Sequence, residues 1–204
     1  MAAKSYDRDY FDRWYRGKGR VRTAAALARK AALSLAVADY LLGRPARTVL
    51  DVGCGEGAWR APLRRLRPGI SYLGVDASEY AVARYGRSRR ILLARFGRLG
   101  DLGLPGPYDL VVCSDVLHYL GGAELARGLP ALASLVGGAV FVDLFTVEDS
   151  IEGDLAGWHP RKARWYADRI RRAGLVPCGL GFWAPPDVAS LLPAVATTGS
   201  GLES

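Results

Sequence analysis

Residues 49–57 read VLDVGCGEG, a short apolar run that breaks into glycines at positions 53, 55 and 57. The run over 48–52 has the length of a buried strand and carries an acid, Asp51, at its fourth position. Glycines directly after such a strand predict a tight turn into a helix, because a Cβ there would forbid positive φ and hold a ligand away from the backbone. Unpaired N–H groups of the following helix face the turn. This stretch therefore predicts a cradle for a nucleotide or nucleoside.

Two further stretches predict strands whose carboxyl ends meet at the same crevice. Residues 72–78, YLGVDAS, end in an acid, Asp76, roughly twenty residues after the last glycine, where a carboxylate can accept hydrogen bonds from both hydroxyls of a ribose. Residues 108–120, YDLVVCSDVLHYL, predict a strand, then polar groups at its end, then the start of a helix.

Together the three segments resemble the class I S-adenosylmethionine-dependent methyltransferases, whose sequences commonly show E/DxGxGxG, an acid after the second strand, and D-L-V-x-x-x-V-L-H-x-L on the fourth. The resemblance covers about residues 45–145. It implies the Rossmann-like methyltransferase fold, a single doubly wound, mostly parallel α/β sheet with helices on both faces. It also implies S-adenosylmethionine as the cofactor and S-adenosylhomocysteine as the product. Residues of the turn would surround the methionine moiety and sugar, namely Asp51, Gly53, Cys54, Gly55 and Gly57, while Asp76, followed by Ala77, would hold the ribose.

A nicotinamide-dependent dehydrogenase is the nearest alternative, because it also places a glycine turn after one strand and an acid after the next. Its fingerprint is GxGxxG, whose third glycine allows close helix packing beside a pyrophosphate. Here GxGxG is followed by Ala58 and Trp59. S-adenosylmethionine has no pyrophosphate, and its ammonium group suits an acid such as Asp51. The motif therefore favours S-adenosylmethionine.

Length and composition predict one domain, since the chain has 204 residues and a mass of 22.0 kDa. No stretch approaches the roughly 18–20 apolar residues that span a bilayer, and the amino terminus lacks a signal-peptide core, so we expect a cytoplasmic protein with no membrane contact. The three cysteines, Cys54, Cys113 and Cys178, lie far apart and give no metal-ligand spacing or disulfide framework. We expect no metal.

The net charge of +8 would suit a nucleic-acid partner. The excess is mostly arginine scattered over expected helices, where it would simply solvate their outer faces. The fourth strand ends in Cys-Ser-Asp instead of the N/D-P-P-Y/F of amino-directed nucleic-acid methyltransferases. A nucleic-acid partner is therefore compatible with the charge but not favoured.

The chain divides into three expected parts: an amino-terminal lid and cover helix over 1–44, a cofactor-binding catalytic domain over 45–196, and a disordered tail over 197–204. Residues 5–16 interleave aromatic and charged side chains, which fits either a lid over the cofactor, hinged at 17–19, or an amphipathic helix packed on the domain. Residues 22–42 predict a helix that covers one face of the sheet and stops at Gly43.

The rest of the chain alternates expected helices and strands. We expect helices over 56–67, 78–85 with Gly86 as its stop, 122–135 with Pro130 as a kink, and 158–173, and strands over 71–76, 91–96, 109–114, 139–145 and 175–184. Only one weak apolar segment, 188–195, follows, so a seventh strand is either absent or replaced by a helix. The acidic loop over 148–154 is the expected place for substrate selection.

Two parts of the cofactor site depart from the family pattern or need assignment. After the third strand the family usually has an acid that contacts the adenine amino group, whereas this chain has glycine and arginine. Asp101 with Leu102 is the substitute candidate. Ser114 and Asp115, at the end of the fourth strand, are expected to line the methionine end.

His118 is the leading candidate for a general base, because an unperturbed imidazole accepts a proton near neutral pH. The alternative is that it packs against the cofactor or the sheet. His159 is the second candidate, and a helix-capping or exposed histidine is its alternative. We predict a methyltransferase for a small-molecule oxygen or nitrogen acceptor. The alternatives are methylation of RNA or protein, or a non-catalytic S-adenosylmethionine-binding partner subunit.

Overall fold

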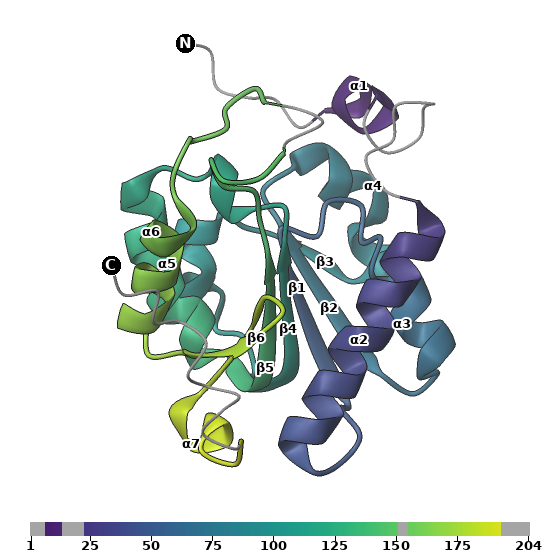
Figure 1. Cartoon of the computed structure of the whole chain (residues 1–204). Coiled ribbons are helices and arrows are strands. Elements are labelled where there is room, and N and C mark those ends of the chain that lie inside the picture. Colours follow the sequence, from purple (N-terminus) through teal and green to yellow (C-terminus); the bar gives the residue numbers. More distant parts are fainter. Residues whose placement is uncertain (1–6, 14–22, 151–154, 193–204) are drawn as a thin grey trace.

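The computed structural model describes residues 7–13, 23–150 and 155–192. Seven strands in this part of the chain form one sheet in the order β3-β2-β1-β4-β5-β7-β6 (Figure 1). The first five are parallel and the last two antiparallel to their neighbours. Their bounds are Thr48–Val52, Ser71–Asp76, Ile91–Leu93, Tyr108–Ser114, Val136–Asp143, Val176–Gly179 and Phe182–Ala184 for β1 to β7. The doubly wound, mostly parallel fold is therefore confirmed.

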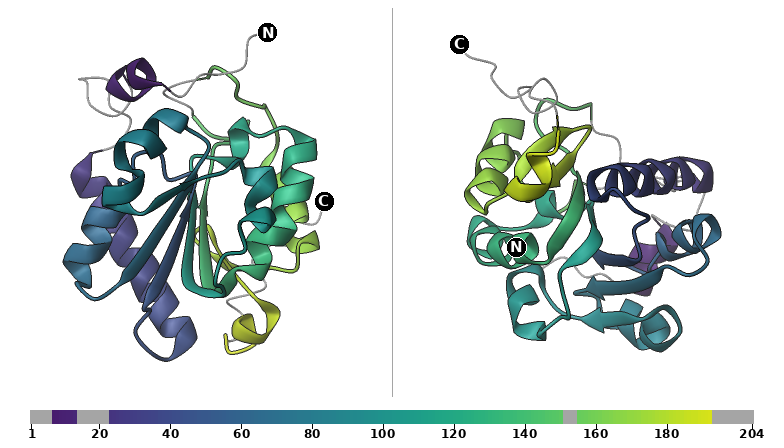
Figure 2. Two further views of the ribbon diagram at one scale, coloured as in Figure 1. Left: turned by 180° about the vertical axis from the view of Figure 1, so that it is seen from behind. Right: turned by 90° about the horizontal axis from the view of Figure 1, so that it is seen from below.

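Helices cover both faces of the sheet, as Figures 1 and 2 show. One face carries α2 (Ala24–Leu42), α3 (Arg60–Leu66) and α4 (Glu79–Arg89), and the other carries α5 (Gly122–Ser134) and α6 (Ala163–Arg172). Short elements complete the described chain: α1 (Arg8–Phe11), α7 (Pro186–Ala189), and the 3₁₀ helices η2 (Phe96–Leu102) and η3 (Leu117–Tyr119). None of the described helices is both long enough and apolar enough to cross a bilayer.

The central strand β4 shows why the sheet is buried on both sides. All seven of its residues are buried, and they alternate between two apolar clusters. Val111 and Cys113 face the cluster under α5 and α6, whereas Leu110 and Val112 face the cluster under α2 and α3. A parallel strand covered by helices on both faces reads as such a continuous apolar run.

The expected strand over 175–184 is instead a hairpin of β6 and β7. Leu180 and Gly181 turn the chain with φ of +51° and +81°, and the Gly181 carbonyl accepts a hydrogen bond from the Val142 amide at 2.8 Å. The seventh strand is therefore present and antiparallel, and the described part of 188–195 contains no strand. The apolar run over 175–184 predicts a single strand because glycines occur both in turns and within strands, so Gly179 and Gly181 did not reveal the turn.

Several element boundaries differ from the expected ones. Helix α3 begins at Arg60 because residues 55–59, which include Gly55 and Gly57, form turns. Helix α4 continues through Gly86 and ends at Arg89, followed by Arg90 as its C-cap with φ of +59°. Strand β3 stops at Leu93, and Pro130 lies inside α5 without ending it. Helix α2 is as expected, with Thr23 at its start and Gly43, at φ of +62°, at its end.

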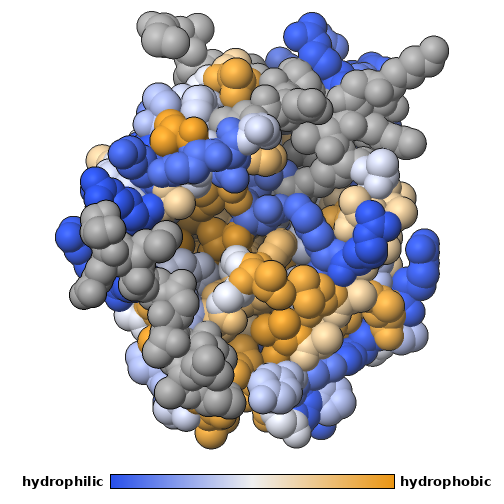
Figure 3. Space-filling view, viewed as in Figure 1, coloured by the Kyte–Doolittle hydropathy of each residue, from blue (hydrophilic) through white to orange (hydrophobic). Residues whose placement is uncertain are grey.

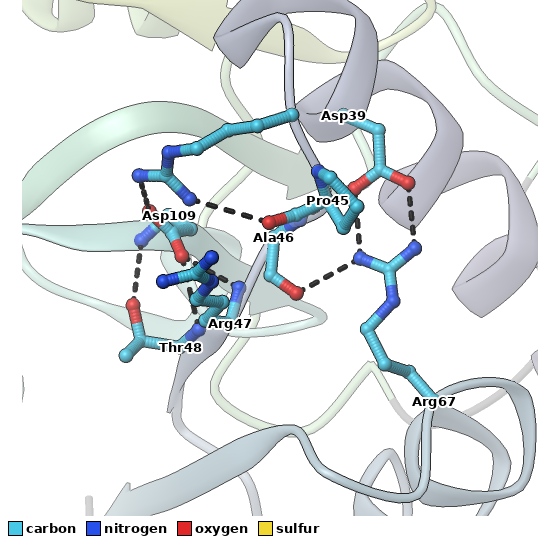
Figure 4. Close-up of polar contacts among 8 residues, drawn as sticks. Asp39, Pro45, Ala46, Arg47, Thr48, Arg67 and Asp109 are labelled. Atoms are coloured by element: carbon cyan, nitrogen blue, oxygen red, sulfur yellow. Dashed lines mark hydrogen bonds and ion pairs between the residues drawn. The ribbon is translucent and has the colours of Figure 1, made fainter.

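At the amino ends of the strands, Asp109 joins β4 to the segment that enters β1 (Figure 4). Its carboxylate accepts hydrogen bonds from the Arg44 guanidinium at 2.7 Å and from the backbone amides of Arg47 and Thr48 at 2.6 and 3.1 Å. Burial raises the pKa of Asp109, but these three donors outweigh it and the pKa is lowered. The carboxylate therefore stays ionised and holds the two central strands in register.

A second carboxylate, Asp39 of α2, performs the same task beside α3 (Figure 4). It accepts two hydrogen bonds from the Arg67 guanidinium, at 2.8 and 2.6 Å, and one from the Ala46 amide at 2.7 Å. The Arg67 hydrogen bond is the main reason that the pKa of Asp39 is lowered. Two hydrogen-bonded carboxylates thus stabilise the edge of the sheet opposite the carboxyl ends.

Candidate active site

A cavity lies where the strand order reverses, over the carboxyl ends of β1, β2 and β4. Open α/β sheets bind ligands at this point because the connecting loops on either side diverge. The cavity is lined by the ends of these strands, the segment after β3, the first turn of α5, and α1. It brings together the three sequence segments that resemble the methyltransferase motifs.

The glycine turn forms one wall of the cavity. Gly53 and Gly55 have φ of +70° and +55° and both line it. A Cβ on Gly53 would lie 2.2 Å from a methyl carbon of Val116, and one on Gly55 would lie 3.2 Å from the Phe11 ring. Gly57, at φ of +74°, faces Ile91 and Tyr72 and does not line the cavity. The turn therefore requires glycine where the backbone approaches the cavity.

Asp76 ends β2 at the edge of the cavity, with Ala77 beside it. Its two carboxylate oxygens accept hydrogen bonds from the Gly55 amide at 2.6 Å and the Ser78 amide at 2.8 Å. Burial raises the pKa of Asp76, against the lowering effect of these amides. Each carboxylate oxygen has two lone pairs, so both oxygens retain capacity to accept a further hydrogen bond from a ligand.

Asp51 and Cys54 lie beneath the turn and do not line the cavity. Asp51 is only 2% exposed, and its carboxylate accepts a hydrogen bond of 2.7 Å from the Tyr72 hydroxyl. Burial and the neighbouring Asp51 carboxylate raise the pKa of that hydroxyl. Sequence reasoning did not find Tyr72, because its ring was counted as an ordinary apolar residue of β2.

On the β3 side of the cavity the lining residues are Ala94, Phe96 and Glu124. Asp101 and Leu102, the expected substitutes, do not line it. The Asp101 side chain is 63% exposed and pairs with Arg98 at 3.1 Å, while Leu102 packs against the core. The η2 helix turns Asp101 outward, and a carboxylate from α5 reaches the cavity in its place.

On the β4 side, Asp115 lines the cavity and has φ of +59°. Its backbone amide donates to the Asp143 carbonyl at 2.7 Å, which holds this left-handed conformation. Ser114 lies just outside the lining, and its hydroxyl donates to the Asp143 carboxylate at 2.9 Å. Lys30 of α2 donates to the same carboxylate at 2.5 Å. Asp143 is therefore a bonded, partly buried acid that ties α2 to the ends of β4 and β5.

His118 is buried, with 1% of its surface exposed, and does not line the cavity. Its ring packs between those of Tyr119 and Phe145, and its Nδ1 accepts a hydrogen bond from the Phe145 amide at 3.3 Å. In the neutral ring one nitrogen accepts and the other carries the hydrogen, so Nε2 is protonated here. Neither nitrogen of the neutral ring is then poised to take a proton.

His159 lies beside His118, because its backbone amide donates to the His118 carbonyl at 2.9 Å. Its half-buried ring does not line the cavity. Burial, and then the positive charge of Arg161, lower its pKa below the ordinary 6.5. His159 is therefore neutral at physiological pH. Arg161 also donates to the Leu120 carbonyl at 2.8 Å, which fastens the 155–162 segment to the loop after β4.

Comparisons with known proteins bear on this geometry. Residues 50–137 match a family model described as a methyltransferase domain. That match spans the glycine turn, Asp76, β4 and Asp115. Over these residues the chain therefore resembles a methyltransferase domain.

Solved structures share this fold at low sequence identity. The sugar N-methyltransferase KedS8 from Streptoalloteichus sp ATCC 53650 is 22% identical with a TM-score of 0.65, over 90% of this chain and 93% of that one. The magnesium protoporphyrin IX methyltransferase (ChlM) from Synechocystis PCC 6803, with bound SAH, is 23% identical with a TM-score of 0.56, over 83% and 86%. An O-methyltransferase family protein from Burkholderia thailandensis is 20% identical with a TM-score of 0.52. The match covers 78% of this chain and 56% of that protein. No curated protein sequence matches the chain.

One of the compared methyltransferases was solved with bound SAH, and the residues of this cavity fit S-adenosylmethionine as a ligand. A Cβ at Gly53 would fill the space that the ligand needs. Asp76, at the end of β2, can still accept hydrogen bonds from ligand hydroxyl groups. When bound, the cofactor supplies an activated methyl group on sulfur. Among the described residues, no group of three or more histidine, cysteine, aspartate or glutamate side chains is placed to hold a metal ion.

Proposed function

We propose that this methyltransferase binds the ribose at Asp76 and Ala77, the thioether region along Gly53 and Gly55, and the amino-acid end near Asp115, and methylates a small molecule on oxygen or nitrogen. The observation that carries the proposal is that one cavity joins Asp76, the glycine turn and Asp115. An elongated ligand with a ribose in its middle matches this order of groups. Two of the compared proteins are named for small acceptors, a sugar and a porphyrin, which supports an acceptor of that class.

Methyl transfer from a sulfonium is an in-line displacement, so the protein mainly aligns the donor with the nucleophile and, for a hydroxyl or ammonium acceptor, removes a proton. In this proposal Asp76 and the glycine turn fix the donor. Asp115 holds the ammonium group. The acceptor enters beside Tyr119 and Asp115, on the side where Arg161 is bonded to the Leu120 carbonyl.

The assay of this proposal is incubation with S-adenosylmethionine and a panel of amino sugars, phenols and carboxylic acids. We expect one acceptor class to gain a methyl group with equimolar release of S-adenosylhomocysteine. Methylation seen only when RNA or protein is added would overturn the small-molecule proposal.

We propose that residues 7–13, the described part of the expected lid over 5–16, cover the cofactor. The expected hinge at 17–19 lies outside the described residues. Phe11 of α1 is 2% exposed, stacks on Tyr80 with ring centroids 5.8 Å apart, and lines the cavity with Tyr10. This short helix has too few residues to be stable alone, so its order depends on what it covers.

Hydrogen exchange tests the lid. Amides of residues 7–13 should become more protected when S-adenosylhomocysteine binds, because the ligand completes the surface under Phe11. Amides in the middle of α2, far from the cavity, serve as the internal control. Unchanged exchange in 7–13 under saturating ligand would remove the lid from this proposal.

For the proton, we propose His159 as the base and His118 as a positioning residue. A neutral His159 can accept a proton, whereas the His118 ring is committed to the Phe145 amide. The rate should fall as pH decreases through the lowered pKa of His159, so the acidic limb of kcat/KM lies below pH 6.5.

His159→Gln should remove this limb with little change in cofactor affinity. His118→Gln should lower the melting temperature and keep the limb. The opposite assignment, with the limb lost only in the His118 variant, would contradict this proposal and restore His118 as the base.

A second candidate, the non-catalytic partner subunit, is favoured by one feature. An apolar groove lies between α2 and the hairpin, lined by Val37, Tyr40, Cys178 and Leu192 among others. Figure 3 shows hydrophobic side chains gathered in the middle of this face. Cofactor binding without turnover on any acceptor, together with a stable complex through this groove, would support it.

A further inference from the structure

Three carboxylates line the cavity, and one of them has no role in the proposed function so far. Asp76 and Asp115 stand at the ends of β2 and β4. The third, Glu124, comes from the first turn of α5. Its Oε1 accepts a hydrogen bond of 3.3 Å from the Gly97 amide, the one hydrogen bond recorded for this side chain within the described chain. The Gly97 amide thus holds one carboxylate oxygen of Glu124, and this bond fixes the orientation of the other oxygen.

The order of strands shows which part of the cofactor lies near Glu124. A ribose at Asp76 has the base on one side and the methionine chain on the other. Strands β1 and β4, with the glycine turn and Asp115, lie on one side of β2, and β3 lies on the other. The methionine chain takes the first side, so the base lies past β2, between Ala94, Phe96 and Glu124.

This end of the cavity has apolar walls and one carboxylate. Ala94 and Phe96 present flat, apolar surface to a ring. An ionised glutamate only accepts hydrogen bonds. Adenine carries an exocyclic amino group, which only donates, whereas a base with oxygen at the same position would face the carboxylate with another acceptor.

We propose that Glu124 is the residue that selects adenine, by accepting a hydrogen bond from the amino group of the base and disfavouring an oxygen there. The assignment rests on the proposed binding of S-adenosylmethionine in this cavity. It also explains how adenine is bound although Gly97 and Arg98 follow β3, where the family usually has an acid that contacts the adenine amino group. A Cβ on Gly97 would lie 3.1 Å from the Glu124 Cγ, so glycine leaves room for the α5 carboxylate beside the backbone.

The test compares two ligands by calorimetry: S-adenosylhomocysteine, and S-inosylhomocysteine, in which oxygen replaces the adenine amino group. The wild type should bind the first about tenfold more tightly or better, since a hydrogen bond to a charged group and its loss are worth that much. Glu124→Gln keeps an oxygen for the Gly97 amide and adds an amide donor. It should weaken the first ligand, strengthen the second, and so abolish or reverse the preference.

Asp101→Ala is the matched control, because it removes an exposed acid from the neighbouring η2 helix. Its preference should equal that of the wild type. If Glu124→Gln weakens both ligands equally or neither, the proposal is overturned. If Asp101→Ala is the variant that loses the preference, the base is recognised there instead. A wild type that binds neither ligand would instead overturn the proposed function itself, so the two failures are distinguishable.

Discussion

Asp76→Ala is expected to lower the affinity for S-adenosylmethionine and S-adenosylhomocysteine about 10³-fold, the sum of two hydrogen bonds from ribose hydroxyls to a charged acceptor. The carboxylate is held by the Gly55 and Ser78 amides in a position where burial raises its pKa. Such an acid is costly to keep ionised in the folded protein, which fits a residue that serves a ligand. Calorimetric titration of the variant measures the loss directly.

Asp76→Asn is the control for this prediction, because it keeps one acceptor oxygen and nearly the same shape. Its loss of affinity should be smaller than that of the alanine variant, with a circular dichroism spectrum unchanged in both. Wild-type affinity in Asp76→Ala would mean that the ribose is held elsewhere.

Gly53→Ala is expected to remove measurable cofactor binding and to destabilise the protein by about 3 kcal/mol. A side chain at φ of +70° costs about 1–2 kcal/mol, and overpacking against Val116, 2.2 Å from the new Cβ, costs a similar amount. The added methyl group also occupies the cradle where the backbone must approach the ligand. Urea unfolding gives the stability, and titration gives the affinity.

Gly43→Ala separates the backbone effect from the steric one. Gly43 has nearly the same backbone, with φ of +62°, but nothing lies within 4 Å of a Cβ built there. This variant should lose about 1 kcal/mol of stability and bind the cofactor as the wild type does. Equal losses of affinity in the two glycine variants would show that the effect of Gly53→Ala comes from global instability and not from the cradle.

The parts of the site that the sequence predicted are those with a local physical cause. A positive φ next to a strand end favours glycine, so the turn at Gly53 and Gly55 was visible in the letters alone. An acid directly after an apolar strand must lie at the carboxyl edge of a parallel sheet, and Asp76 does. The alternation of buried strands and helices likewise predicted the doubly wound sheet.

The parts that the sequence did not predict depend on contacts between distant residues. Glu124 meets Gly97 from 27 positions away, and Lys30 meets Asp143 from 113 positions away. No periodicity or spacing records such pairs, because they follow from how α5 and α2 pack on the sheet. Asp101 lies outside the cavity lining for the same reason, since the η2 helix decides which way its side chain turns.

The histidines show a third case, in which the position was foreseen and the orientation was not. His118 follows β4 in the η3 helix, as its place in the motif indicated. Its ring nonetheless turns away from the cavity toward the Phe145 amide. Which nitrogen carries the hydrogen depends on that amide, from a segment that the motif does not include.

The most direct test of the account is a calorimetric titration of the wild-type protein with S-adenosylhomocysteine, run beside NAD. We predict one ligand bound per chain for S-adenosylhomocysteine, with a Kd in the micromolar range or below, and no heat of binding with NAD. Binding of NAD alone would contradict the account, because the glycine turn and Asp76 would then serve a dinucleotide.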